Sequence, residues 1–269
     1  MSSVTVILGS ASDKPIFDKC KAVFDEFDVS YDVHVASAHR TPEKVDEIVR
    51  GIDETCKEYE TPFVGGDTKK AKELVLSGAA LGVIERGEIL RRSNAKAGDI
   101  VAVTGNIGNA VLGLEILLRK IRISRKNRKF VNAFLMPEAR VREGRVIAKS
   151  KVGAAAMDIS DGFLYSACEI AKMSRVRIDL DREKIPISED AIQASGEFGM
   201  SCEQLLYGGE DYELLVAIRE NMFDEIREKI KKVGGRLIEV GEARSGRGVR
   251  LDGKVIEARG YDAFLGKDF

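Results

Sequence analysis

The sequence contains no tryptophan and only two histidines, His34 and His39, among its 269 residues. Cysteine is also scarce, at Cys20, Cys56, Cys168 and Cys202, and no two cysteines have CxxC spacing. The histidines do not complete a metal-ligand pattern with these scattered cysteines. We therefore expect the cysteines to be small buried residues in a reducing compartment, the cytoplasm.

An excess of charge of one sign is also missing, because 43 basic residues face 44 acidic ones and the formal net charge is -1. This balance gives no electrostatic reason to expect a nucleic-acid partner. No apolar run approaches the roughly 18 residues of a membrane span, and the first residues lack the pattern of a signal peptide. The chain instead has 44% hydrophobic residues and 26 glycines, which is typical of one large or two modest globular domains.

The first sixty residues alternate between two kinds of hydrophobic pattern. Residues 4–8 and 31–36 are short apolar runs typical of β-strands, whereas 15–27 and 42–59 repeat apolar residues at helical spacing. Pro42 suits the first position of the second helix, with Thr41 before it as N-cap. The order βαβα predicts the start of a parallel, flavodoxin-like sheet.

Later residues continue to alternate without an internal repeat. We expect strands at 73–83, 100–104, 154–159, 176–180 and 212–218, with further strands after Arg236. We expect helices at 105–118, 162–173, 202–206 and 223–233. The basic stretch 119–129 could contact a phosphate, but the pattern favours a solvated loop or helix end.

Two polar loops follow the first two predicted strands and should lie at the same sheet edge. In the first, Ser10 and Asp13 stand on a glycine turn that enters a helix, where backbone N–H groups and the helix dipole favour an anion. In the second, His39 could carry a proton beside the anion-binding Arg40. The alternatives are a tight turn with Asp13 as N-cap and a structural histidine.

Together the motifs GSxSD and SAHRTP resemble the purine-pathway aminoimidazole ribonucleotide carboxylase, also called N5-carboxyaminoimidazole ribonucleotide mutase. The resemblance implies that Ser10 and Asp13 bind the ribonucleotide, that His39 transfers the proton and that Arg40 holds the phosphate. It covers about the first 45 to 50 residues. The later histidine motif of that family has no counterpart, since no histidine follows His39.

Three acidic clusters on glycine turns follow: GGDT at 65–68, DISDG at 158–162 and GGEDYE at 208–213. Phosphoryl transfer between two anions requires heavy screening of negative charge, which carboxylates provide by holding magnesium against phosphate oxygens. Any one cluster could be an ordinary acidic turn. Three of them predict a site for a metal ion and phosphate.

The same three motifs occur in this order in thiamine-monophosphate kinase. Between the first two, that family also has the motif found here as RSNAKAGD at 92–99, and its last motif extends to GGEDYEL, found here at 208–214. The resemblance spans about 210 residues, and that family belongs to the aminoimidazole ribonucleotide synthetase-like superfamily. It implies Mg²⁺-dependent transfer of the γ-phosphate of ATP to thiamine monophosphate, which gives thiamine diphosphate.

The resemblance also implies roles for individual residues. Nucleotide or phosphate contacts would come from Gly66, Asp67, Thr68, Arg92 and Ser160. Asp158 and Asp161 would be catalytic and, with Asp67, would bind magnesium. Glu210, Asp211 and Tyr261 would contact the thiamine substrate, and Ala263 stands where the closing motif of the family has histidine.

Motifs of the kinase family that precede GGDT, namely GDDAA, TTD and SDLAAMG, are not found in this sequence. We therefore expect a βαβα segment at 1–50, a partial synthetase-like N-terminal domain at 51–134 and a complete α+β domain at 135–269. The middle piece should form an incomplete sheet that needs a partner, and both resemblances imply a homo-oligomer.

Four interpretations follow. The first is a thiamine-monophosphate kinase whose rate is lowered by the missing acidic motifs. The second is a mutase or carboxylase acting on an aminoimidazole ribonucleotide. The third is an inactive nucleotide-binding fusion, and the fourth is the artificial joining of two genes.

Overall fold

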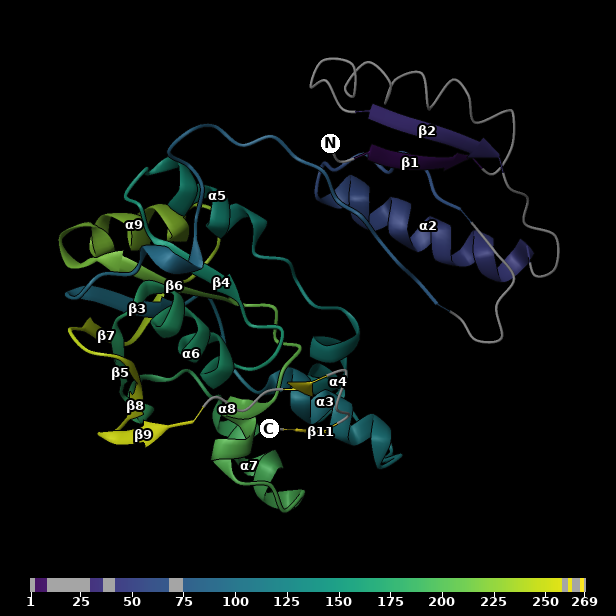
Figure 1. Cartoon of the computed structure of the whole chain (residues 1–269). Helices are drawn as coiled ribbons and strands as arrows, with labels where there is room; N and C mark the ends of the chain where they lie inside the picture. The colour runs from purple at the N-terminus through teal and green to yellow at the C-terminus, as the bar shows by residue number, and fades with distance from the viewer. Residues whose placement is uncertain are drawn as a thin grey trace. The chain divides into compact units, whose positions relative to one another are not determined.

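The computed structural model describes residues 3–8, 30–35, 42–67, 75–257, 261–262 and 267–268. By its internal contacts the chain divides into two units, Met1–Leu81 and Gly82–Phe269, which are described separately (Figure 1). This division does not coincide with either domain boundary expected from the sequence, near residues 50 and 134. Those two boundaries stay predictions.

The first unit contains two strands and one long helix in its described part. Strand β1 (Ser3–Leu8) pairs in parallel with β2 (Ser30–Val35). Helix α2 spans Pro42–Glu58 and begins at the expected proline. The predictions of both strands, their parallel pairing and this helix are confirmed. The helix expected at 15–27 lies outside the described residues.

The second unit is built on a seven-stranded mixed sheet with the order β4-β6-β3-β7-β5-β8-β9. Its strands are β3 (Asp99–Val103), β4 (Ala155–Asp158), β5 (Arg177–Leu180), β6 (Leu214–Arg219), β7 (Ile238–Arg244), β8 (Gly248–Leu251) and β9 (Lys254–Ile256). All neighbouring strands run antiparallel except β5 and β8. Near the C-terminus, β10 (Tyr261–Asp262) pairs with β11 (Lys267–Asp268) in a separate ribbon.

Seven α-helices accompany this sheet within the described residues. They are α3 (Asn109–Leu118), α4 (Arg128–Leu135), α5 (Val141–Lys149), α6 (Phe163–Ser174), α7 (Glu189–Glu197), α8 (Cys202–Tyr207) and α9 (Glu220–Lys232). Two 3₁₀ turns, η2 (Arg92–Asn94) and η3 (Arg182–Lys184), complete the set. Within the part of the chain that the structure describes, no helix combines the length and apolarity needed to cross a membrane.

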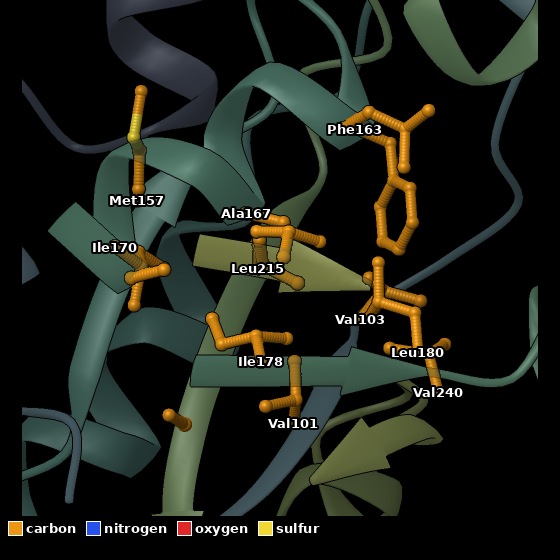
Figure 2. Close-up of a cluster of buried hydrophobic side chains, with 14 of the residues drawn as sticks. Val101, Val103, Met157, Phe163, Ala167, Ile170, Ile178, Leu180, Leu215 and Val240 are labelled. Carbon is orange, nitrogen blue, oxygen red and sulfur yellow. The ribbon is translucent and has the colours of Figure 1, made fainter. Parts of the chain in front are cut away.

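The sheet is covered on both faces, which makes the unit three-layered (Figure 1). Alternate residues of β3 show this, because Val101 and Val103 pack with helix α6 whereas Ala102 packs with α5 and α9. Figure 2 shows the first of these clusters, in which Phe163 and Ile170 of α6 lie against side chains of the sheet. Helices α3, α4, α7 and α8 form a smaller apolar cluster of their own.

Two expectations about the middle of the chain are wrong. Residues 75–83, most of the segment expected as a strand at 73–83, form neither helix nor strand because none of the described strands pairs with them. The segment 51–134 does not form a separate incomplete sheet, since β3 lies between β6 and β7 at the centre of the large one. The expectation of a mixed α/β architecture is confirmed.

Candidate functional site

Two of the acidic loops are held together by main-chain hydrogen bonds. The loop at 158–162 follows β4 and the loop at 208–213 precedes β6, and these strands pair with Asp158 opposite Leu214. The Glu210 N–H donates to the Ser160 carbonyl at 2.8 Å, and the Tyr212 N–H donates to the Ile159 carbonyl at 3.0 Å. The sheet thus continues as a ladder into both loops and fixes their positions relative to each other.

Glycine is required where the loops meet. A Cβ on Gly209 would stand 2.2 Å from the Ser160 carbonyl oxygen, and a Cβ on Gly162 would stand 2.3 Å from that of Tyr207. Gly162 also has a φ of 111°, which side-chain-bearing residues rarely adopt. The glycines of both motifs therefore permit the close approach of the two backbones.

Three carboxylates lie close enough to Tyr212 for their charges to act on its hydroxyl. Burial is the main cause of the raised pKa of Tyr212. The negative charge of Glu210 and a hydrogen bond between the Tyr212 and Glu210 side chains raise this pKa further, as do the charges of Asp158 and Asp161. Glu210 and Tyr212 have φ values of 72° and 50°, a backbone conformation that is uncommon outside glycine and that often marks functional loops. Asp158, Asp161 and Glu210, three of the predicted acids, thus all act on the same side chain.

A pocket of about 570 Å³ opens beside this point, within the size range of small-molecule sites. Arg92, Arg140, Asp158 and Tyr212 supply its polar walls, and residues such as Leu90 supply apolar ones. The turn η2 brings Arg92 there, since its carbonyl accepts a hydrogen bond from the Ser174 hydroxyl at the end of α6. The pocket thus joins two residues that the sequence pointed to, Arg92 and Asp158.

Asp211 turns away from the loop and caps helix α3. Its carboxylate accepts hydrogen bonds from the N–H groups of Gly108 at 2.8 Å and Ala110 at 3.1 Å. Burial raises the pKa of Asp211 to about 7, although these N–H donors oppose the rise. The carboxylate therefore ties the acidic loop to the N-terminus of a helix, and its expected role towards thiamine stays a prediction.

Glu213 forms a second internal anchor for the same loop. Its carboxylate accepts two hydrogen bonds from Arg140, at 2.6 and 2.7 Å, and one from the Thr104 hydroxyl at 2.7 Å. The Glu213 side chain is 7% exposed and that of Arg140 is 19% exposed. The hydrogen bonds to Glu213 raise the pKa of Arg140, which stays fully charged. This is a nearly buried ion pair with satisfied hydrogen bonds.

The structure places only part of the predicted site. It brings Arg92, Asp158, Ser160, Asp161 and Glu210 to one edge of the sheet. Gly66 and Asp67 belong to the first unit, whose position relative to this edge is not determined. Ser10, Asp13, His39, Arg40 and Thr68 lie outside the described residues, and for Tyr261 only the backbone is described.

Sequence reasoning missed Tyr212, Thr104 and the Arg140–Glu213 pair. Glu213 stands directly before the apolar strand β6, and an acid entering a buried strand must find a cation or a hydrogen-bond donor. The position of Glu213 before a buried strand could therefore have predicted that its carboxylate has a partner. Nothing in the sequence shows that Arg140, 73 residues earlier, is its partner.

The carboxylates at this edge suit a magnesium ion only in combination with other ligands. Within the described ranges, no group of three or more Asp, Glu, His or Cys side chains is arranged to hold a metal. Magnesium commonly binds to one or two protein carboxylates and takes its remaining oxygen ligands from water and phosphate. Asp158 and Asp161 fit that incomplete donor set.

Family models match two parts of the sequence. The model described as AIR synthase related protein, C-terminal domain, matches residues 96–254, and that described as AIR carboxylase matches residues 3–59. Thiamine-monophosphate kinase from Methanospirillum hungatei is 34% identical over 82% of this chain and 69% of its own length. The Bacillus subtilis enzyme is 30% identical over 83% of this chain and 71% of its own length. The chain belongs to the thiamine-monophosphate kinase family.

Solved structures agree with this membership. Thiamine monophosphate kinase from Aquifex aeolicus matches with a TM-score of 0.67 and 29% identity, over 79% of this chain and 69% of that one. The complex of AaThiL with AMPPCP and TMP matches with a TM-score of 0.66 and 28% identity, over 82% of this chain and 68% of that one. E. coli HypE, a hydrogenase maturation protein, shares the fold at 19% identity with a TM-score of 0.64, over 82% of this chain and 70% of that one.

The chain spans 69%, 63% and 63% of the length of the kinases from Methanospirillum hungatei, Methanopyrus kandleri and Pyrococcus abyssi. About a third of each relative thus has no counterpart in the matched region. Family membership rests on the shared part, and the family model at 96–254 covers strands β3 to β8 of the large sheet.

Proposed function

We propose that this chain transfers the γ-phosphoryl group of ATP to thiamine monophosphate, giving ADP and thiamine diphosphate. Family membership supports the reaction, and the relative AaThiL has been solved with AMPPCP and TMP. The observation on this chain that carries the proposal is the pair of main-chain hydrogen bonds that hold the 158–162 and 208–213 loops together beside a pocket lined by Arg92 and Asp158.

The acids of the 158–162 loop are assigned to the metal and phosphate. Asp158 and Asp161 would bind magnesium, which, when bound, screens the charge of the phosphate oxygens. Asp158 ends strand β4 and its carbonyl oxygen accepts a hydrogen bond from the Ser166 hydroxyl of α6, so its backbone is fixed from both sides. A rigid backbone here keeps the carboxylates in position as charge moves during transfer.

Arg92 is assigned to the polyphosphate. It is exposed, lines the pocket beside Asp158 and makes no ion pair with another described residue. Arg140 lines the same pocket but is engaged by Glu213. Arg92 is thus the guanidinium that is free to bind an anion, in the geometry that suits phosphate.

The acceptor side is assigned to the 208–213 loop. Glu210 faces the pocket-lining Tyr212, and Asp211 holds the loop against α3. Phosphoryl transfer breaks the bond between the β–γ bridging oxygen and the γ-phosphorus, and it forms a bond from a phosphate oxygen of thiamine monophosphate to that phosphorus. Because the earlier acidic motifs of the family are not found in this sequence, we expect the rate to be low.

A kinase assay on the purified full chain tests the proposal. Thiamine diphosphate is measured after incubation with ATP, Mg²⁺ and thiamine monophosphate, for the unmodified chain and for Asp158→Asn and Asp161→Asn. Asp224→Asn on α9 is the matched control, since this acid is 82% exposed and its ion pair is with Arg227, three residues away. Loss of product with the first two variants but not with the control is expected.

A second reaction deserves a parallel assay because residues 3–59 match the AIR carboxylase model. Conversion of the carboxylated aminoimidazole ribonucleotide is followed for the same preparation and for His39→Asn. Turnover in this assay alone, lost with His39→Asn, would replace the kinase proposal. Binding of nucleotide without turnover in either assay would support the inactive fusion.

A further inference from the structure

A second pocket, here called the β8 pocket, lies between helix α6 and strands β8 and β9. Its volume is about 690 Å³, which is within the range of small-molecule sites. The pocket beside Asp158 is lined by β4, at one edge of the large sheet, whereas β8 and β9 form the other edge. The two pockets share no lining residue. The β8 pocket is therefore separate from the candidate site.

Much of the lining of the β8 pocket is apolar. Ala171 of α6 and Val249 of β8 are each 1% exposed, and Ile256 of β9 packs against the same core cluster. Burial, with the nearby charge of Glu169, raises the pKa of Cys168 to about 11, so this thiol is neutral and adds to the apolar wall. Such a surface suits the apolar or aromatic part of a small molecule.

The charged residues of the β8 pocket are mostly cations. Lys172, Arg175 and Arg247 line it, whereas Glu169 is the one acid among the described lining residues. Glu169 pairs with Lys172 at 3.3 Å. Within the described part of the chain, neither Arg175 nor Arg247 makes an ion pair or a side-chain hydrogen bond. Two guanidinium groups beside this pocket thus lack a carboxylate.

Neighbouring arginines on the same sheet differ in this respect. Arg177 of β5 donates two hydrogen bonds of 2.9 Å to the carboxylate of Asp179, and Arg244 of β7 lies 3.4 Å from the same carboxylate. Uncompensated positive charge at the mouth of a pocket raises the local concentration of anions. The absence of acids beside Arg175 and Arg247 therefore favours a negatively charged ligand.

Arg175 also occupies a backbone position that favours glycine. It follows the last residue of α6 with a φ of 57° and a ψ of 38°, the left-handed conformation. Its N–H donates to the Lys172 carbonyl at 3.3 Å, and the Val176 N–H donates to the Ala171 carbonyl at 3.0 Å. These bonds occupy two of the last carbonyls of the helix, which would otherwise repel an anion. A side chain here costs stability, and such backbone outliers often mark functional positions.

We propose that the β8 pocket binds a small organic phosphate, with its phosphate held by Arg175 and Arg247 and its apolar part against Val249 and Ile256. Guanidinium groups bind phosphate oxygens through paired hydrogen bonds, and a doubly negative group matches two of them in charge. This binding does not depend on the proposed kinase activity.

Calorimetry on the full chain with 1-naphthyl phosphate tests the proposal. The compound should bind, whereas 1-naphthol and inorganic phosphate should each bind about tenfold more weakly or less, because each lacks one half of the ligand. Excess AMPPCP with Mg²⁺ should leave the binding unchanged. Competition by AMPPCP would place the compound in the kinase site and overturn the proposal, as would inorganic phosphate binding equally well.

Arg175→Gly separates binding from folding. Because glycine suits the left-handed conformation, this variant should be at least as stable in urea as the unmodified chain. It should nevertheless bind 1-naphthyl phosphate about tenfold more weakly, and so should Arg247→Gln. Arg227→Gln is the matched control, since it also removes one positive charge but lies on α9, which covers the other face of the sheet. Unchanged binding by Arg175→Gly, or an equal loss with Arg227→Gln, would overturn the proposal.

Alkylation of the cysteines locates the bound compound. Cys168 lines the β8 pocket, whereas Cys202 lies on α8. Bound 1-naphthyl phosphate should slow the reaction of Cys168 with N-ethylmaleimide, followed by mass spectrometry of the peptides, and leave that of Cys202 unchanged. Equal rates at Cys168 with and without the compound would contradict binding in this pocket.

Discussion

Arg140 binds both carboxylate oxygens of Glu213, at 2.6 and 2.7 Å, and so joins the start of helix α5 to the start of strand β6. Glu213 is the last residue of the loop that carries Glu210 and Tyr212. Thr104 adds a third hydrogen bond, and its hydroxyl also accepts one from the Leu214 N–H. The acidic loop is thus held from the core side by a charged network.

Arg140→Ala should destabilise the second unit strongly, by about 3–5 kcal/mol, because it leaves the Glu213 charge nearly buried and short of donors. Arg182→Ala is the matched control, since the Arg182–Asp252 pair has side chains 43% and 47% exposed. Breaking such an exposed pair should cost less than about 1 kcal/mol. Urea denaturation of both variants measures the difference, and equal costs would contradict the role given to the network.

Gly209→Ala should separate the two acidic loops, because the added Cβ would collide with the Ser160 carbonyl oxygen. We expect reduced thermal stability and weakened binding of an ATP analogue in the presence of Mg²⁺, measured by calorimetry. The control is Gly196→Ala in helix α7, where a Cβ meets nothing within 4 Å. That change should raise helix stability by up to about 1 kcal/mol. Unchanged nucleotide binding by Gly209→Ala would count against a site between these loops.

Asp211 predicts a pH dependence of stability. Its pKa is about 7 in the folded chain and near 3.8 for a free side chain, so the folded state holds the proton more tightly. The unfolding free energy should therefore fall as the pH rises from about 4 to about 7, and this contribution should level off above 7. Asp211→Asn cannot titrate and should lack this fall. Denaturation of both proteins at several pH values measures the difference, and parallel curves would contradict the shifted pKa.

Much of the fold could be predicted from the sequence where the local pattern and the tertiary partners agree. Strands β3, β4 and β6 are apolar runs beside glycine turns, and helix α6 has an apolar face that it buries. Helices α4, α5 and α7 were missed, although α4 and α5 are clearly amphipathic. Their local pattern was a usable signal that the sequence reasoning did not apply to residues 128–149.

The candidate site could also be predicted only in part. Glycine turns with acids identified the 158–162 and 208–213 loops, and the structure brings these two together. The different orientations of Glu210 and Asp211, adjacent in sequence, could not be predicted, because they depend on the φ of 72° at Glu210 and on helix α3 from a distant part of the chain. The expected strand at 73–83 illustrates the reverse case, where a good strand pattern finds no partner among the described strands.

Product formation under single-turnover conditions shows whether the acidic loops beside Tyr212 perform phosphoryl transfer. With the chain in excess over radiolabelled ATP, and with Mg²⁺ and thiamine monophosphate present, label should appear slowly in thiamine diphosphate. The signal should disappear with Asp158→Asn and persist with Asp224→Asn. No product above the Asp158→Asn background, from a chain that is folded and binds ATP, would contradict phosphoryl transfer at this site.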